Sequence, residues 1–387
     1  MEALIYSPGL LVLLIAIAAG WAQSGFWGAL NKEDAQTEAS TPQTPIQWIE
    51  PFQFGLPADM GELPTGLANV TAQGCNACHF QAHNDWVGSA HAGTGQDPVF
   101  RAAIERSANS TACKQCHLPL AVQHPSLATG YIEGDLSRPK LVANAAWDPT
   151  LMAEGVGCAA CHVRSGHIIS TREIRGGPHP VAASRTLGTS EMCATCHQMS
   201  FPESDRPYYD TYGEWKASPY ADAGMRCQDC HMPPTAGIAS ATRFAATPSH
   251  GFQSDISRAL SVLVDLESAE IQRGTATTAR IRIQNTGAGH HVPTGSPYKS
   301  YVIQVSLTDI NGVDLTPPHV ERLERKVSTE APYNTLFDNR IAAGGEHEVQ
   351  TEFLVSHSKK AGPVRLTVRI GRDGNAPVLQ SIPLELL

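Results

Sequence analysis

The sequence predicts a mostly α-helical and irregular module packed around cofactors, followed by an all-β immunoglobulin-like sandwich and preceded by an N-terminal transmembrane or signal helix. Three observations predict this architecture: the ten cysteines of the 387-residue chain all lie within residues 75–230, β-rich runs begin after residue 258, and residues 3–30 lack charged side chains. The expected segments are a membrane anchor or signal segment at 1–31, a linker at 32–65, the cofactor module at 66–258 and the sandwich at 259–387.

The N-terminal segment contains an unbroken apolar run at Leu10–Ala19. A helix over Leu10–Leu30 would extend about 31 Å at about 1.5 Å per residue, enough to cross a bilayer. A cleaved signal peptide, with Gly20-Trp21-Ala22 as its cleavage site, is the alternative. Glu2 is the only charged side chain before the linker, and signal peptides begin with a positive charge, so we prefer an uncleaved anchor. The linker that follows is rich in Thr, Pro, Ala, Gln and Glu, which is typical of an extended segment.

The cysteines form five Cys-x-x-Cys pairs, and a histidine follows each pair directly. The five motifs are Cys75, Cys78 and His79; Cys113, Cys116 and His117; Cys158, Cys161 and His162; Cys193, Cys196 and His197; and Cys227, Cys230 and His231. Cys-x-x-Cys-His is the attachment signature of c-type haem. The two thiols form thioethers with the vinyl groups of one porphyrin, and the histidine becomes an axial ligand of the iron. Zinc ribbons, thioredoxin-type redox motifs and disulfides give no reason for five repetitions that each end in His.

The sequence therefore predicts five covalently attached haem c groups. The five motifs lie within residues 75–231, which leaves too little chain to build a separate core around each haem. We expect the haems to form most of the core, in the fold class of a multihaem cytochrome c. A charged content of 17% and an aromatic content of 6% fit a chain wrapped closely around porphyrins.

Five irons with two histidine ligands each require five histidines beyond those in the motifs. The candidates come from distinctive local contexts, namely a Trp-x-x-Ser-x-His segment, a site shortly after a motif, a Pro-His-Pro, a Ser-His-Gly-Phe and a Gly-His-His-Val-Pro. In that order they are His91, His124, His179, His250 and His290. The less favoured alternatives are His83, His167, His291, Met192, Met199 and Met225.

An internal repeat accompanies the motifs. The segment Trp86–Ala92 resembles Trp215–Ala221, because both follow the pattern Trp-x-x-Ser-x-(His/Tyr)-Ala. A haem motif follows each copy, starting at Cys113 and at Cys227, and this order favours a duplication within the chain. Tyr220 occupies the place that His91 has in the other copy, and we interpret it as structural.

The sequence pattern changes after Arg258, where β-rich runs are separated by glycine-containing turns. These runs are Leu263–Ile271, Thr277–Asn285, Tyr301–Asp309, Glu346–Val355 and Val364–Ile370. Short strands at this spacing favour an immunoglobulin-like sandwich. The region contains no cysteine, so it cannot carry an antibody-type disulfide.

Several of these segments resemble known multihaem proteins. Gly155–His162, Ser190–His197 and Cys227–Pro233, together with the Trp-x-x-Ser-x-His-Ala segment, resemble hydroxylamine oxidoreductase and its tetrahaem electron-acceptor cytochrome. The run Asn285–Gly295 resembles a β-domain that follows some of these cytochromes. The resemblance implies close-stacked haem pairs and mostly bis-histidine iron. It does not extend to the haem number of the catalytic members, which carry eight.

These observations favour a membrane-associated multihaem protein that relays electrons, because iron with two histidine ligands has no open position for a substrate. One alternative is an oxidoreductase that acts on a small nitrogen or sulfur compound at one five-coordinate haem. Another is a haem-chain subunit that the β-domain docks into a larger complex or polymer. Whether the protein is an enzyme is left open, with a carrier preferred.

The expected partners are a quinol-linked or periplasmic electron donor and an acceptor, with the membrane contacted through the N-terminal segment. Haem attachment in bacteria takes place outside the cytoplasmic membrane, so we expect the protein to be anchored at the periplasmic face or exported. The net charge of −9 excludes a nucleic-acid binder that works by neutralising phosphates.

Overall fold

The computed structural model describes residues 57–106, 111–133, 135–201, 203–241, 243–372 and 376–387. These residues belong to one compact unit, Ile46–Leu387. We refer to residues 57–258 as the motif module and to residues 259–387 as the β-module.

The expectation of a mostly α-helical fold is wrong. Helices account for only 22% of the structure and strands for 35%, distributed over many sheets. In the described part of the motif module the longest helix, α3, has nine residues. The reason is that each motif requires little more than one helical turn. Residues i, i+3 and i+4 lie on the same helical face, so one turn presents both thiols and the histidine together.

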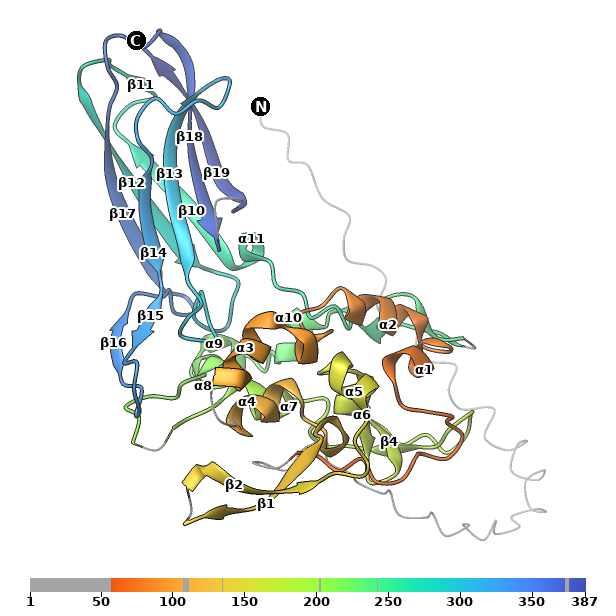
Figure 1. The fold of residues 1–387 in the computed structure, drawn as a ribbon. Coiled ribbons are helices and arrows are strands. Elements are labelled where there is room, and N and C mark those ends of the chain that lie inside the picture. The colour runs from red at the N-terminus through yellow and green to blue at the C-terminus, as the bar shows by residue number, and fades with distance from the viewer. Residues whose placement is uncertain (1–56, 107–110, 134, 202, 242, 373–375) are drawn as a thin grey trace, which may run out of the picture. The chain divides into compact units, whose positions relative to one another are not determined.

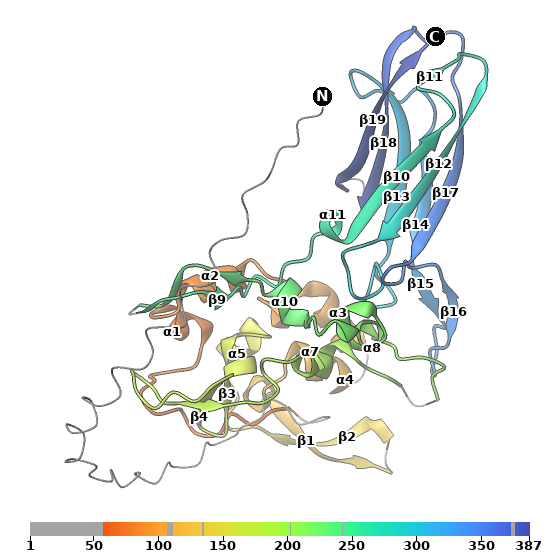
Figure 2. The same cartoon turned by 180° about the vertical axis from the view of Figure 1, so that it is seen from behind.

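The helices of the motif module are short, and four of them end on the histidine of a haem motif. They are α1 (Ala72–Asn76), α2 (Phe80–Val87), η1 (Thr94–Gln96), α3 (Pro98–Arg106), α4 (Thr111–His117), η2 (Ala121–Gln123), α5 (Pro149–Glu154), α6 (Cys158–His162), α7 (Ser190–His197), α8 (Thr211–Lys216), α9 (Pro219–Asp222), α10 (Cys227–His231) and α11 (Ile256–Ala259). Helix α4 lies beside α7 in both ribbon views (Figure 1, Figure 2).

Small sheets connect these helices, and the sequence analysis did not anticipate them. They are the hairpin β1 (Ser126–Ile132) with β2 (Asp135–Ala143), the sheet of β3 (Val163–Arg164), β4 (His167–Ser170) and β5 (Val181–Ala183), the pair β6 (Pro234–Thr235) with β9 (Thr247–Pro248), and the hairpin β7 (Ile238–Ser240) with β8 (Arg243–Phe244). Backbone pairing satisfies the polar groups of segments that have no helix and few apolar side chains.

The β-module consists of two sheets and one hairpin. The three-stranded sheet consists of β10 (Leu260–Leu266), β12 (Ala276–Asn285) and β17 (Glu346–Leu354). The five-stranded sheet has the order β11 (Glu270–Ile271), β19 (Val378–Leu386), β18 (Gly362–Gly371), β13 (Tyr301–Asp309) and β14 (His319–Leu323). The hairpin pairs β15 (Arg325–Val327) with β16 (Thr335–Asp338). The long strands run side by side (Figure 1). Each of the five β-rich runs of the sequence overlaps at least one of these strands.

One hydrophobic core joins the two sheets of the β-module. Alternate residues point inward, as period-2 strands require. Ile281 and Ile283 of β12 are fully buried, as are Ile303 of β13 and Leu366 of β18. The expected anchor or signal segment at 1–31 and most of the linker lie outside the described residues, and within those described no helix is long and apolar enough to cross a bilayer.

The described end of the predicted linker is packed rather than extended. Ala58 and Met60 are buried in a small second cluster with Val70, Leu120 and Leu151.

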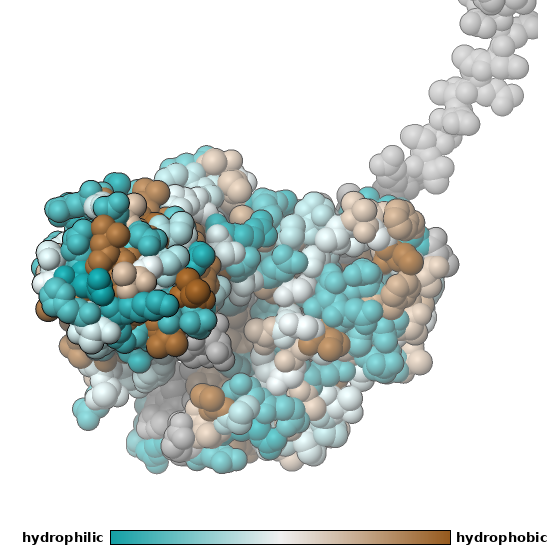
Figure 3. Space-filling view, turned by 90° about the horizontal axis from the view of Figure 1, so that it is seen from above, coloured by the Kyte–Doolittle hydropathy of each residue, from teal (hydrophilic) through white to brown (hydrophobic). Residues whose placement is uncertain are grey.

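The surface of the protein is mixed in hydropathy. On the face that Figure 3 presents, hydrophobic residues form small patches separated by hydrophilic ones.

Candidate haem-binding sites

The ten motif cysteines are all free thiols. No set of three or more His, Cys, Asp or Glu side chains among the described residues is placed to bind a bare metal ion. A haem iron needs fewer protein donors, because the porphyrin supplies four nitrogens and the protein supplies only axial ligands. The donors of each motif are therefore suited to haem c.

Four motif histidines each face a histidine from another part of the chain. The ring-centroid separations are 6.3 Å for His79 and His179, 6.3 Å for His197 and His91, 6.2 Å for His162 and His250, and 6.1 Å for His231 and His290. An imidazole nitrogen binds a transition metal at roughly 2 Å, and the ring centre lies about 1 Å behind it, so two imidazoles on one iron have centroids about 6 Å apart. The four pairs have the separation that an intervening iron requires.

Five of these eight rings are oriented by a backbone carbonyl. Their Nδ1 atoms lie 2.6–3.0 Å from the carbonyl oxygens of Ala239 (His79), Ile169 (His162), Gln253 (His231), Pro248 (His250) and His291 (His290). A carbonyl can only accept, so each Nδ1 donates and Nε2 keeps its lone pair for a metal. Strands β4, β7 and β9 supply three of these carbonyls, which gives the unanticipated small sheets a role at the sites.

Burial lowers the pKa of five of the eight paired rings, namely those of His91, His162, His197, His250 and His290. The pKa of His162 is about 4, with burial as the largest cause and the neighbouring rings of His250 and His79 also lowering it. Burial likewise lowers the pKa of His197 to about 4, with His91 and His231 adding to the effect. Neutral imidazole is the form that binds metals, so these sites favour ligation at neutral pH.

The second motif is different, because no histidine ring among the described residues faces His117, and the candidate ligand His124 forms no ring pair with any motif histidine. The buried His124 directs its Nε2 at the carbonyl oxygen of Leu118, 2.7 Å away. The ring next to His117 is instead that of Phe100, stacked at 4.2 Å with an interplanar angle of 8°. The described residues include all sixteen histidines, and none of them forms with His117 a ring pair of the kind found at the other four motifs.

The less favoured ligand candidates His83, His167 and His291 have other partners. The ring of His83 lies 5.8 Å from that of Trp86, and His167 Nδ1 lies 2.7 Å from the carbonyl oxygen of Ser165. His291 Nδ1 lies 3.6 Å from the Glu214 carboxylate. None of them forms a ring pair with a motif histidine.

The motifs adjoin one another in an order that differs from their order in the chain. The sulfur atoms of Cys75 and Cys158 are neighbours, so the first motif adjoins the third. The sulfur atoms of Cys193 and Cys227 are likewise neighbours, so the fourth motif adjoins the fifth.

The fourth motif also adjoins the second and the third. Cys116 Sγ lies 3.8 Å from the carbonyl oxygen of Cys196. Cys196 also lies close to the sulfur of Cys161 in the third motif. The motifs thus run 1, 3, 4, 5, with motif 2 beside motif 4. At the two ends of that line, Cys78 and Cys230 are the exposed cysteines.

The internal repeat has a structural counterpart. Trp86 Nε1 donates to the carbonyl of Val156 at 2.9 Å, and Trp215 Nε1 donates to that of Met225 at 2.9 Å. Each acceptor lies two residues before the first cysteine of a motif. Trp86 therefore braces the third motif, Cys158, although the sequence pairing assigned it to the second.

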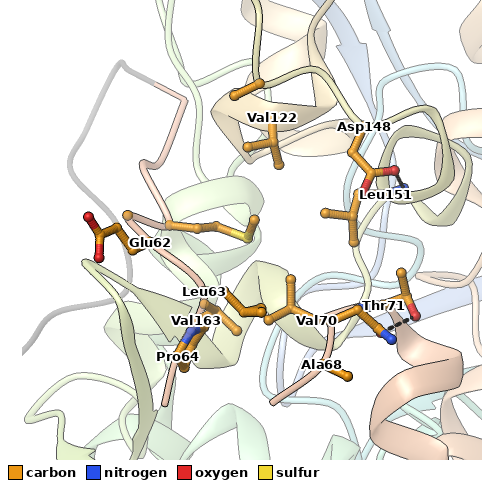
Figure 4. A pocket seen from close by; sticks show the side chains of 14 residues that line it. Glu62, Leu63, Pro64, Ala68, Val70, Thr71, Val122, Asp148, Leu151 and Val163 are labelled. Carbon is orange, nitrogen blue, oxygen red and sulfur yellow. Dashed lines mark hydrogen bonds between the residues drawn. The ribbon is translucent and has the colours of Figure 1, made fainter. Parts of the chain in front are cut away.

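One cavity of the motif module lies away from these sites. It has a volume of about 270 Å³, and none of its lining residues is a cysteine or a histidine. Val70, Val122, Leu151 and Val163 face into it (Figure 4). It belongs to the small apolar cluster of the motif module.

The sequence analysis missed three kinds of contributor to the sites, which are the carbonyl acceptors, Phe100 and the buried Glu214. None of them has a sequence signature of its own. The Trp-x-x-Ser repeat was the available signal for Glu214, which directly precedes Trp215.

The fold of the chain is similar to that of a solved multihaem cytochrome c. The solved structure of a penta-heme cytochrome c552 from Thermochromatium tepidum matches with a TM-score of 0.56 at 16% identity, over 82% of this chain and 98% of that one. The CARDB domain of PF1109 from Pyrococcus furiosus matches 33% of this chain with a TM-score of only 0.21. No protein-family model and no curated protein matches the sequence. The likeness is one of fold.

Proposed function

We propose that this protein is an exported electron-transfer cytochrome that carries five covalently attached haem c groups. The observation that carries the proposal is the set of four histidine pairs at 6.1–6.3 Å, each joining a motif histidine to a distant one. Such pairs leave no open iron position, and that suits electron transfer rather than substrate binding. The likeness to a penta-heme cytochrome supports the same reading at the level of fold.

The residues of each site have separate roles. The two thiols of a motif hold the porphyrin, and the motif histidine binds the iron from one side. The partners on the other side are His179, His250, His91 and His290 for motifs 1, 3, 4 and 5. Haem supplies a reversible one-electron change at its iron, and the protein sets the potential through burial and hydrogen bonds. The carbonyls that accept from Nδ1 raise the donor strength of the ring.

The order of the motifs supports a branched relay. Motifs 1, 3, 4 and 5 form a line, and motif 2 adjoins motif 4. The exposed Cys78 and Cys230 mark the ends of the line, where we propose that a donor and an acceptor protein dock. Anchoring of the protein through residues 1–31 stays a prediction, which the mass of the mature N-terminus tests.

Two measurements test the proposal. Pyridine haemochrome assay and intact mass of the purified protein should give five haems per chain. Replacement of Cys113 and Cys116 by Ser should remove one haem and leave the others. Electron paramagnetic resonance of the wild-type protein should show bis-histidine low-spin signals from four irons. A high-spin signal from most of the irons would overturn the assignment of the histidine pairs.

The second motif favours a second candidate function, which is reduction or oxidation of a small molecule at its iron. The supporting observation is that Phe100, and no histidine, lies beside His117. Reduced protein should bind close to one equivalent of carbon monoxide, and the variant with Ser at positions 113 and 116 should bind none. His124→Ala is the matched control and should bind as the wild type does. Absence of binding to the wild type would exclude this function.

A further inference from the structure

The loop between β12 and β13 carries His290 from the β-module to the fifth motif. The His290 ring lies nearly parallel to that of His231, at 6.1 Å and 12°. Within the β-module, the fully buried Asn285 braces the loop, because its Nδ2 donates to the carbonyls of His290 at 2.8 Å and Ile341 at 3.2 Å. This brace shapes the loop, but it does not set the distance to His231.

A buried carboxylate of the motif module holds the same loop from the other side. Glu214 of α8 accepts from the backbone N–H of His291 at 3.1 Å and from the hydroxyl of Thr294. It also pairs with Arg340 of the β-module at 2.8 Å, and Arg340 pairs with Asp338 at 2.8 Å. The Glu214 side chain is 3% exposed and that of Arg340 is 6% exposed. A carboxylate this deeply buried is screened less by water than a surface carboxylate, so it acts more strongly on its neighbours.

The residue after Glu214 is tied to the fifth motif. Trp215 Nε1 donates to the carbonyl of Met225, two residues before Cys227. Adjacent residues of one short helix therefore hold both sides of the site: Glu214 holds the His290 loop, and Trp215 holds the start of the helix that ends in His231.

The loop also packs closely against the repeat segment. A Cβ atom at Gly289 would lie 3.2 Å from both Trp215 Cδ1 and Tyr220 Cβ, so a side chain here would push these two side chains back by a few tenths of an ångström. The Tyr220 hydroxyl donates to the carbonyl of Thr286 at 2.7 Å. In the second copy of the repeat, Tyr220 contacts the β-module at the place where the first copy presents His91.

We propose that Glu214 is the positioning residue of the fifth haem site, which sets the separation of His290 from His231 and so makes the β-module part of the haem-binding machinery. This inference rests on the proposed function, in which these two histidines bind one iron. It predicts that loss of Glu214 changes the coordination of one iron in five, and of no other.

Purified full-length Glu214→Ala protein tests the inference by electron paramagnetic resonance, with haem counted in parallel. We expect five haems per chain, a loss of one of the four bis-histidine low-spin signals, and the appearance of one high-spin or altered signal. His290→Ala should give the same spectrum, and the double variant should lose no further signal. Glu214→Gln keeps an acceptor oxygen for the His291 amide and should restore most of the lost signal.

Arg325→Met is the matched control. Arg325 is 3% exposed, donates to the carbonyl of Pro207 at 2.8 Å and to the hydroxyl of Thr335, and lies opposite Asp338 on the neighbouring strand without a hydrogen bond to Glu214. It should lower the unfolding temperature without changing any spin state. If Glu214→Ala also lowers only the unfolding temperature, the positioning role is refuted. If His290→Ala keeps all four signals, the ligand assignment fails instead, and haem counting shows that attachment itself is intact.

Discussion

Replacement of His124 separates the histidine assignment made from sequence from the one that the structure supports. The sequence analysis made His124 a candidate axial ligand of one of the irons, whereas the structure directs its Nε2 at the carbonyl of Leu118. We expect His124→Ala to keep every haem spin state. The variant leaves a buried carbonyl without its donor, which costs about 1–3 kcal/mol of unfolding free energy.

His179→Ala is the matched comparison, because His179 faces His79 at 6.3 Å. Removing one of four pairs should remove a quarter of the bis-histidine low-spin intensity. Electron paramagnetic resonance at low temperature, integrated against a copper standard, measures that fraction, and thermal unfolding measures the stability cost. The reasoning is refuted if His124→Ala converts one iron to high spin, or if His179→Ala converts none.

Three further predictions concern the packing around the sites. Burial raises the pKa of Glu214, but His291 and Arg340 outweigh it and hold the pKa at about 2. Compared with about 4.3 in the unfolded chain, this shift adds on the order of 3 kcal/mol to the free energy of unfolding. The contribution is present above about pH 4 and is lost as the pH falls toward 2. Between about pH 4 and pH 2, the unfolding free energy of the wild type should therefore fall more steeply with pH than that of Glu214→Gln, which acid unfolding followed by circular dichroism measures. Equal slopes in the two proteins would refute the role of the carboxylate. Phe100→Ala, which removes a ring 5% exposed, should lower stability by about 3–5 kcal/mol and alter the optical spectrum of one haem. Ile281→Ala should cost about 2–5 kcal/mol and, in partly unfolded samples, release the His290 ligand alone; release of several ligands together would show that the β-module supports more than one site.

The contribution of the buried polar cluster at Glu214 to the stability of the protein does not follow from its ion pairs alone. A buried ion pair is often no more stabilising than well-packed apolar residues. Its removal on one side only is costly, because the remaining charge stays buried. Here the cluster joins two modules at a defined distance, and that geometric role explains a charge pair at this position better than stability does.

The β-rich runs show what a local pattern can predict. Tyr301–Asp309 has the same bounds in the sequence analysis and as strand β13, because alternation of apolar residues and a following Asn-Gly turn are local properties. The small sheets of the motif module lack such a pattern. Strands of two to four residues, such as β4 and β7, form because the chain between motifs must satisfy its backbone, and tertiary packing decides where it does so.

By itself the sequence predicted the chemistry of attachment, because two thiols three positions apart and a directly following imidazole have the spacing that meets one porphyrin edge and its iron. It also singled out His91, His179, His250 and His290 as ligand candidates from their local contexts. Only the tertiary structure decided which motif each of them faces and that His124 faces none. The physical reason is that a pairing distance between residues as far apart as His79 and His179 depends on how the whole chain packs, and the spacing of neighbouring residues carries no record of it.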